Sequence, residues 1–234
     1  MRAMKTIGML GGMSWESSAV YYRILNREVQ KRLGGIHSAK TLMHSCDFAE
    51  MAALQGAGRW DEAHDQMSTI AVNLAKSGAD FLIICCNTMH TAAAQMERAA
   101  RIPLLHIADP LGEALKKAGV RRPALLGSRH TMERDDVLKG RLRSGFGIEV
   151  MVPEGADAAE VNRVIYEECT RGQFLDGSRA NYRAIIARLV ANGADSIILG
   201  CTELPLLVQP EDSTVPLFDT TTLHALAAVD KALS

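Results

Sequence analysis

One segment of the sequence occurs twice, and this repetition restricts the folds that the chain can adopt. Residues 78–86 and residues 193–201 each begin Gly-Ala-Asp, continue through an apolar run and end at a cysteine, Cys86 in the first copy and Cys201 in the second. The two cysteines are 115 residues apart, about half of the 234-residue chain. A second pair of landmarks, Leu10-Gly11 and Leu126-Gly127, is 116 residues apart. Two matching offsets indicate an internal duplication of one folding unit.

Apolar runs alternate with amphipathic stretches along the whole chain. The runs at 81–85 and 123–127 are short and continuous, as buried parallel strands are. Residues 60–77 instead carry apolar side chains at helical spacing. Strands that alternate with helices form right-handed βαβ units around a parallel sheet. The sequence therefore predicts an α/β protein of two pseudo-symmetric, doubly wound parallel-sheet domains, with the active site in the cleft between them.

The repeat also suggests where the domains begin and end. We expect the first domain to hold residues 1–108 and 212–234, and the second to hold residues 109–211. The second copy of the repeat reads as complete near residue 210. A final strand at 215–218 and a final helix at 221–233 are therefore expected to return to the first domain. Further strands are expected at 103–107 and 148–152, and one helix at 131–143.

Composition restricts the partners and the compartment. The net charge is −1 and 23% of the residues are charged, which suggests neither nucleic acid nor a membrane surface as a partner. The apolar run at 6–10 is too short for a signal peptide, and no apolar run reaches the length of a membrane span. Five cysteines without Cys-x-x-Cys spacing make a disulfide framework improbable. We expect a cytoplasmic protein with reduced thiols.

Cys86 and Cys201 each follow a predicted strand and precede a predicted helix. In open α/β sheets, ligands bind beyond the carboxyl ends of the strands. A helix N-terminus at that point is expected to lower a thiol pKa from about 8.5 toward neutrality. Two such thiols could remove a proton from one face of a carbon and return it to the other, which inverts its stereochemistry. The polar side chains of Asn87, Thr88 and Thr202 could hold a carboxylate and stabilise enolate-like charge.

Four segments resemble, in the same order and over nearly the whole chain, the signature segments of the aspartate/glutamate racemase family. They are residues 11–17, 86–90, 126–133 and 200–203. The resemblance implies an amino-acid racemase that needs no cofactor, acts on an acidic amino acid and is usually a homodimer. It also implies that Cys86 and Cys201 are the catalytic base/acid pair. Some close relatives carry Thr at the first of these positions, so Cys86 favours racemisation in both directions.

The same resemblance implies a set of substrate-binding residues. They are Met13, Ser14, Gln55, Asn87, Thr88, Thr202 and, for the distal carboxylate of the substrate, Arg171.

Other interpretations compete with this one. Either cysteine could be a buried structural residue, and Cys85 is expected to face the core. A zinc site at Cys85, Cys86 and His90 would lack a fourth ligand. Glu203 is interpreted as a first-turn helix acid rather than a residue that orients Cys201, and His224 as a packing residue.

The glycines at 8–12 match neither a dinucleotide nor a P-loop motif, and are interpreted as letting the backbone approach a carboxylate. At the level of function, a decarboxylase or cis–trans isomerase of a small dicarboxylate remains an alternative. So does a protein that binds an amino acid without chemistry.

Overall fold

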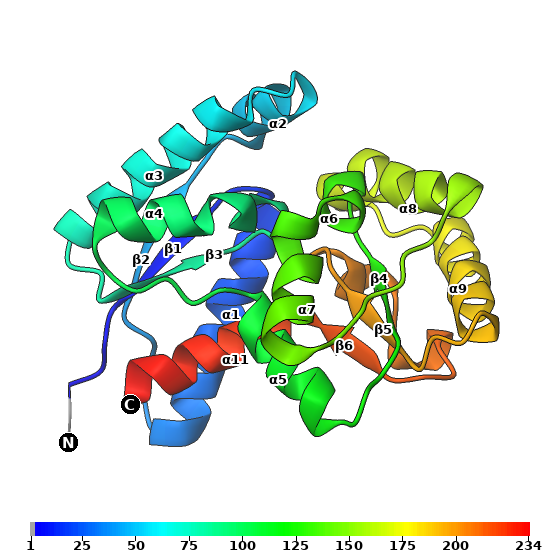
Figure 1. Ribbon diagram of the computed structural model, residues 1–234. Helices are drawn as coiled ribbons and strands as arrows, with labels where there is room; N and C mark the ends of the chain where they lie inside the picture. Colours follow the sequence, from blue (N-terminus) through cyan, green and yellow to red (C-terminus); the bar gives the residue numbers. More distant parts are fainter. Residues whose placement is uncertain (1–2) are drawn as a thin grey trace. The chain divides into compact units, whose positions relative to one another are not determined.

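The computed structural model describes residues 3–234, which form an α/β protein with two three-stranded parallel sheets (Figure 1). The strands are β1 (Ile7–Gly11), β2 (Thr41–Ser45), β3 (Phe81–Ile84), β4 (Pro123–Leu126), β5 (Ser196–Leu199) and β6 (Leu217–Asp219). The longer helices are α1 (Trp15–Leu33), α2 (Phe48–Gly56), α3 (Trp60–Lys76), α4 (Ala93–Ala100), α5 (Ala108–Lys117), α8 (Gly155–Glu167), α9 (Asp176–Ala191) and α11 (Thr220–Leu233). The short ones are η1 (Thr88–Ala92), α6 (Arg129–Glu133), η2 (Asp135–Lys139), α7 (Gly140–Phe146), η3 (Cys169–Arg171), α10 (Leu204–Leu207) and η4 (Pro210–Asp212). The predicted α/β fold class with two parallel-sheet domains is confirmed.

The two sheets share one pattern. The first has the order β2-β1-β3, and Leu104 adds a single parallel bridge to Leu82 of β3. The second has the order β4-β5-β6, and Met151 adds a single parallel bridge to Ala124 of β4. The Met151 segment therefore corresponds to β2, and β6 corresponds to the Leu104 segment. The strands predicted at 103–107 and 148–152 exist only as these two bridges.

The predicted return of the last strand to the first domain is wrong. β6 pairs with β5, with Leu217 opposite Ile197, so it completes the second sheet. The second repeat is longer than the sequence suggested, because α10 and η4 separate β5 from its last strand. The helix predicted at 131–143 is also interrupted. Arg134 is extended, with φ −79° and ψ 135°, and separates α6 from η2, which continues directly into α7.

The chain divides into two compact units. Unit 1 extends to Ile107 and resumes at His224, and unit 2 holds Ala108–Leu223. Helix α5 follows the last segment of the first sheet, yet it belongs to unit 2. Helix α11 follows the last strand of the second sheet, yet from His224 onward it belongs to unit 1. We call α5 and α11 the exchanged helices.

The Gly-Ala part of the repeat ends a helix in the same way in both units. Gly78 has φ 100° after α3, and Gly193 has φ 96° after α9. Only glycine adopts this backbone conformation readily. The amide of the following alanine then donates back to the helix, from Ala79 to the Leu74 carbonyl and from Ala194 to the Leu189 carbonyl.

The aspartate of the repeat ties the start of the cysteine-bearing strand to its neighbour. The Asp80 carboxylate accepts a hydrogen bond of 2.6 Å from the Thr6 amide. The Asp195 carboxylate accepts bonds of 2.7 and 3.1 Å from the amides of Arg121 and Arg122. Both contacts fix the alignment of two parallel strands, so the repeated sequence reflects repeated local structure.

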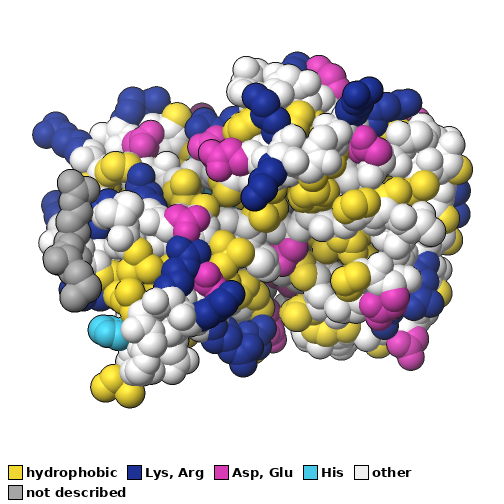
Figure 2. All heavy atoms as spheres, turned by 90° about the horizontal axis from the view of Figure 1, so that it is seen from below, with side chains coloured by type: hydrophobic (Ala, Val, Ile, Leu, Met, Phe, Trp, Pro, Cys, Tyr) yellow, Lys and Arg dark blue, Asp and Glu magenta, His cyan; other side chains and the backbone are white. Residues whose placement is uncertain are grey.

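Each unit has its own apolar core. In unit 1, α3 and α4 cover one face of the sheet, and α1 and α11 cover the other (Figure 1). The α1 face is filled by Tyr21, Leu25 and Val29 against Val229 of α11, all fully buried. Figure 2 shows basic, acidic and apolar side chains mixed over one face of the surface. Among residues 3–234, no helix is both long and apolar enough to cross a membrane.

Candidate active site

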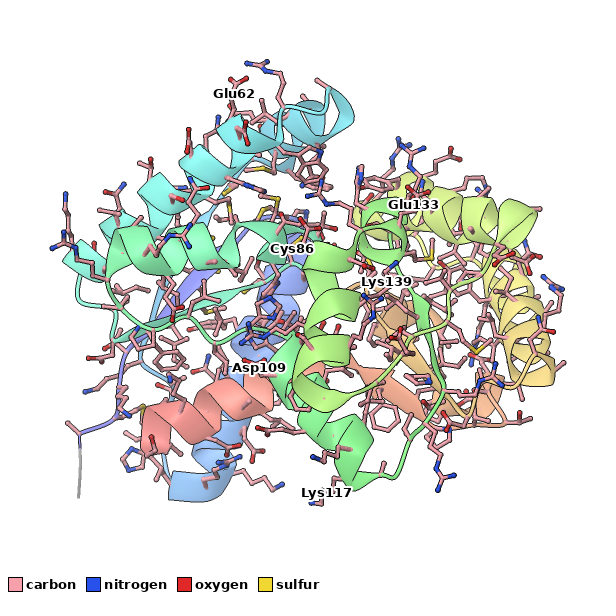
Figure 3. All side chains as sticks on the ribbon, in the orientation of Figure 1. Glu62, Cys86, Asp109, Lys117, Glu133 and Lys139 are labelled. Atoms are coloured by element: carbon pink, nitrogen blue, oxygen red, sulfur yellow. The ribbon has the colours of Figure 1, made fainter. Side chains whose placement is uncertain are left out.

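Cys86 and Cys201 follow equivalent strand ends. The Cys85 amide donates to the Leu10 carbonyl at 2.8 Å, and the Gly200 amide donates to the Leu126 carbonyl at 2.7 Å. In each unit the next residue is the repeated cysteine, and both cysteines are half-buried (Cys86 is labelled in Figure 3). Cys85 is fully buried in the core, as predicted, and burial raises the pKa of its thiol.

The residues around Cys86 form the unit 1 part of the candidate site. Cys86 packs against a cluster that includes Met13 and Met89. Gln55 is buried in α2 and donates from Nε2 to the Met89 sulfur at 3.2 Å. The fold thus brings Gln55 to Met89 in the segment that follows Cys86, and it places Met13 in the apolar cluster against which Cys86 packs. Three further predicted residues, Ser14, Asn87 and Thr88, are also buried.

The turn before α1 explains the glycine at position 12. Gly12 has φ 88°, and a Cβ there would lie 2.2 Å from the Cys46 carbonyl oxygen. Its amide donates to the Ser18 hydroxyl at 2.8 Å, and that hydroxyl donates to the Ser14 carbonyl at 3.2 Å. The close passage of the Cys46 backbone therefore requires glycine here, a reason different from the carboxylate contact inferred from the sequence.

His90 holds the backbone that follows Cys86. Its Nδ1 lies 2.8 Å from the Cys86 carbonyl oxygen, and its Nε2 lies 3.2 Å from the Ile107 amide nitrogen. A carbonyl accepts and an amide donates, so the ring is neutral with its proton on Nδ1. Burial, reinforced by His106 and His224, lowers the pKa of His90 well below its usual value. The three rings are close, at centroid distances of 4.6 and 5.6 Å from His90.

His224 is a packing residue, as predicted. It is fully buried in α11, where its Nδ1 accepts from the Tyr21 hydroxyl at 2.8 Å. Its Nε2 donates to the Leu105 carbonyl at 2.9 Å. The ring joins α11 to α1 and to the segment before α5, all within unit 1 or at its boundary.

The surroundings of Cys201 differ from those of Cys86. The Cys201 thiol donates to Oε2 of Glu203 at 2.9 Å, and the Thr202 hydroxyl donates to the same oxygen at 2.9 Å. Glu203 is only 2% exposed. Burial and the Glu203 carboxylate raise the pKa of the Cys201 thiol well above its usual value. The predicted lowering of this pKa is therefore wrong, and so is the view of Glu203 as a plain helix acid.

The reason lies in the short helices that follow the cysteines. α10 contains 4 residues and η1 contains 5, so neither concentrates much positive charge on the preceding thiol. The carboxylate of Glu203 is nearer to the Cys201 thiol, since it accepts a hydrogen bond from it. Glu203 directly precedes α10, and its side chain is directed back to Cys201.

Arg171 is the last of the predicted substrate-binding residues. Arg171 ends η3 and is exposed, with Gly172 in the left-handed conformation after it. Cys169 is buried in the same turn, and burial raises the pKa of its thiol to about 12. Among residues 3–234, no three His, Cys, Asp or Glu side chains gather as metal ligands.

Comparisons with known proteins agree with the signature segments. The sequence model of the Asp/Glu/hydantoin racemase family matches residues 10–228. The chain is 25% identical to the broad specificity amino-acid racemase RacX of Bacillus subtilis, over 97% of this chain and 98% of RacX. It is 47% identical to a candidate Asp/Glu racemase of known structure from Yersinia pestis, covering 99% of this chain and 100% of that one with a TM-score of 0.91.

More distant structures show how widely this fold is used. PH1733 from Pyrococcus horikoshii, an aspartate racemase homologue, is 29% identical, covers 99% of this chain and 100% of its own, and has a TM-score of 0.84. A variant of arylmalonate decarboxylase, at 17% identity and a TM-score of 0.54 over 98% of this chain and 94% of its own, shares only the fold. The maleate isomerase of Pseudomonas putida does so too, at 14% identity and a TM-score of 0.57 over 98% and 93%.

The resemblance noted in the sequence is thereby confirmed across both units. The matched region contains both cysteines and every candidate residue around them. The chain belongs to the Asp/Glu/hydantoin racemase family and is an enzyme of the racemase class.

Proposed function

We propose that this protein interconverts the enantiomers of an acidic amino acid, aspartate or glutamate, without a cofactor, and that Cys86 and Cys201 are its two acid/base groups. The observation that carries the proposal is the equivalence of the two thiols. Cys86 comes one residue after the hydrogen bond from the Cys85 amide to the Leu10 carbonyl. Cys201 comes one residue after the equivalent bond from the Gly200 amide to the Leu126 carbonyl. Racemisation by two bases requires such a pair, whereas a protein that only binds an amino acid does not.

In one direction, a Cys86 thiolate removes the α-proton and the Cys201 thiol delivers its own proton to the opposite face of the carbon. The enzyme is then left with a Cys86 thiol and a Cys201 thiolate, ready for the reverse reaction. The raised pKa of Cys201 suits the role of proton donor. Glu203 accepts the hydrogen bond of that thiol and so orients it, and in the reverse direction the base is the Cys201 thiolate that the forward reaction leaves.

The α-proton of an amino acid is weakly acidic, so the charge that develops must be stabilised. In the proposal, Asn87 and Thr88 provide amide and hydroxyl donors directly after Cys86. Thr202 provides a hydroxyl beside Cys201, although in this structure it donates to Glu203. Met13 and Ser14 contribute the turn before α1.

The distal carboxylate of the substrate needs a partner of its own. Arg171 is the proposed partner, because it is exposed and is the last residue of the turn that begins at Cys169. Gln55 is proposed to contribute through its contact with Met89. The five cysteines are free thiols, which fits a reducing, cytoplasmic setting.

Hydrogen exchange at the substrate tests the proposal directly. Reduced protein is incubated with L-aspartate or L-glutamate in deuterium oxide. The expected result is loss of optical activity together with one deuterium at the α-carbon. Parallel reactions with an arylmalonate and with maleate test the decarboxylase and isomerase alternatives. Product from either of these, with no exchange into the amino acids, would reject the racemase proposal.

A further inference from the structure

A surface pocket of about 390 Å³ lies in unit 1, lined by the end of β2, the start of α2 and one face of α3. Small-molecule sites usually have volumes of about 300–1,000 Å³. The residues assigned to the candidate active site all lie within the described part of the chain, and none of them lines this pocket. The pocket is therefore a second cavity that the racemase reaction does not use.

The pocket carries negative charge. Asp47 and Glu50 line it, together with the imidazole of His44, and no lysine or arginine of residues 3–234 does so. Neither carboxylate forms an ion pair with that part of the chain. Exposed carboxylates elsewhere, such as Glu62 and Glu149, are paired with arginines. The charge of the pocket is thus left without a partner from the protein itself.

Glu50 does not cap its own helix. Asp47 is the N-cap of α2, and its Oδ1 accepts a hydrogen bond of 3.0 Å from the Ala49 amide. Glu50 follows Asp47 by three residues, where a glutamate can complete a capping box by accepting from the N-cap amide. Within residues 3–234 that bond is not formed. Burial and the Glu50 carboxylate instead raise the pKa of the half-buried Cys46 thiol, so the carboxylate lies near another residue of the pocket lining.

Helix α3 contributes neutral polar groups. Gln66, Thr69 and Asn73 line the pocket, and their spacing of three and four residues puts them on one face of the helix. The Thr69 hydroxyl donates to the Asp65 carbonyl at 3.0 Å. The side-chain amides of Gln66 and Asn73 make no hydrogen bond within the described residues. Carbonyl oxygens of two amides are therefore available beside the two carboxylates.

We propose that this pocket binds a small organic cation, a diamine with primary ammonium groups on a short aliphatic stem. An ammonium group has three N–H donors and no acceptor, which suits carboxylate and amide oxygens. Met51 and Ile70 also line the pocket and provide apolar surface for the stem.

Other classes of ligand fit less well. An anion would lie beside the carboxylates of Asp47 and Glu50 with no lysine or arginine of the lining to bind it. A free amino acid would bring its own carboxylate to the same place, so the ligand differs in class from the proposed substrate. A metal ion lacks ligands, because no three His, Cys, Asp or Glu side chains of residues 3–234 gather around one point.

Calorimetric titration of the reduced, intact protein tests the class of ligand. The probe 1,4-diaminobutane is expected to bind saturably, with one molecule per chain, and its affinity should fall as the ionic strength rises. The matched control is 1,4-butanediol, which has the same carbon chain without charge and should not bind. Absence of diamine binding at millimolar concentration would overturn the proposal, and so would equally tight binding of the diol.

Charge-removing variants test the two carboxylates. Glu50→Gln and Asp47→Asn are each expected to raise the dissociation constant of the diamine about tenfold or more. Asparagine is also a good N-cap, so Asp47→Asn retains the start of α2. Glu113→Gln in α5 removes a carboxylate elsewhere and should leave the affinity unchanged. Equal affinity of all three variants would show that the pocket is not the site.

Amide NMR shifts during the same titration locate the bound probe. The largest shifts are expected at residues 44–51 and 66–73. Shifts centred on the segments that contain Cys86 and Cys201 would instead mean that the diamine occupies the candidate active site, which would overturn the proposal. None of these measurements depends on racemase activity, so their failure leaves the proposed function untouched.

Discussion

The two repeated cysteines occupy equivalent backbone positions but have different chemical surroundings. Cys86 packs against an apolar cluster that includes Met13 and Met89, on a backbone segment held by the neutral ring of His90. Cys201 donates to a buried carboxylate. A duplication explains the shared position, and the difference suits a reaction in which the two groups have opposite roles at any moment.

Removal of either thiol should stop the reaction. Cys86→Ala and Cys201→Ala are each expected to lower the rate of racemisation by at least about 10²-fold to 10⁴-fold, the usual contribution of an acid/base group. Chiral chromatography of aspartate and glutamate after timed incubation measures the effect. Cys46→Ala is the matched control and should keep its activity. Full racemisation by either single variant would show that the two-thiol mechanism is wrong.

Glu203 should control the pH range in which Cys201 acts. The carboxylate raises the pKa of the Cys201 thiol, so Glu203→Gln lowers that pKa. In the direction in which Cys201 delivers the proton, the fall in rate at alkaline pH is expected to move to lower pH. Loss of a charged hydrogen bond should also reduce the rate about tenfold. The pH profiles of this variant and of Glu113→Gln, an exposed control in α5, distinguish these effects from a general loss of stability. An unchanged alkaline limit would contradict the role of Glu203.

The sequence predicted the cysteines but misjudged Glu203. The position of a cysteine after a strand follows from the spacing of the repeat, because strand ends align in a parallel sheet. The direction of the Glu203 side chain depends on the turn between Cys201 and α10, whose geometry the sequence does not specify.

At the scale of secondary structure elements, the repeated Gly-Ala-Asp sequence determines where the helix ends and where the following strand begins. A left-handed glycine ends the helix, and the aspartate two residues later binds the neighbouring strand. The sequence showed the repetition clearly. It did not reveal that the segments at 103–107 and 148–152 are reduced to single bridges, because their apolar composition is the same as that of a full strand.

Removal of the repeated aspartate, Asp80 in unit 1 or Asp195 in unit 2, should lower the stability of the protein by a similar amount. Asp80→Ala leaves one backbone amide and Asp195→Ala leaves two without a charged acceptor, and each substitution is expected to lower the free energy of unfolding by about 1.5–3 kcal/mol. Urea denaturation measures the change. Asp61→Ala, at the exposed start of α3, should have a much smaller effect. A large effect in only one unit would contradict the structural equivalence of the two repeats.

The buried histidines should make the protein sensitive to acid. The pKa of His90 is lowered in the folded protein, so below the ordinary value of about 6.5 the unfolded chain binds a proton that the native state refuses. Stability is therefore retained above that pH and lost as the pH falls further, by up to about 1.4 kcal/mol per pH unit from this residue. Chemical denaturation of wild-type protein and of His90→Asn between pH 7 and pH 5 measures the slope. The variant should show a shallower slope, whereas exposed His37→Asn should match the wild type.

At the scale of the whole molecule, each of the exchanged helices follows the sheet of one unit in the sequence and belongs to the other unit. The sequence indicated two α/β units but assigned β6 to the wrong one. The sequence did not show that β6 and the helix α11 after it belong to different units, because unit membership depends on packing rather than on order along the chain. Here the boundary falls inside α11, between Leu223 and His224.

A destabilising substitution in α11 should therefore lower the stability of strands near the start of the sequence. Val229 is fully buried against the α1 face of the first sheet, and Val229→Ala is expected to cost about 2 kcal/mol. Hydrogen exchange should show reduced protection in β1 and β3, more than 140 residues earlier, before β4 and β5 are affected. Ala227→Ser, on a less buried part of α11, is the control. Equal loss of protection in both sheets would show that the two units unfold together.

The exchanged helices also determine when each unit can be completed during synthesis. The core of unit 1 lacks the buried side chains of α11 until that helix emerges from the ribosome, although the three strands of unit 1 are complete by residue 84. Unit 2, by contrast, has all of its own residues as soon as position 223 is available. The unit that begins first is therefore the one that is completed last, and until then only α1 covers the face of its sheet that α1 and α11 later share.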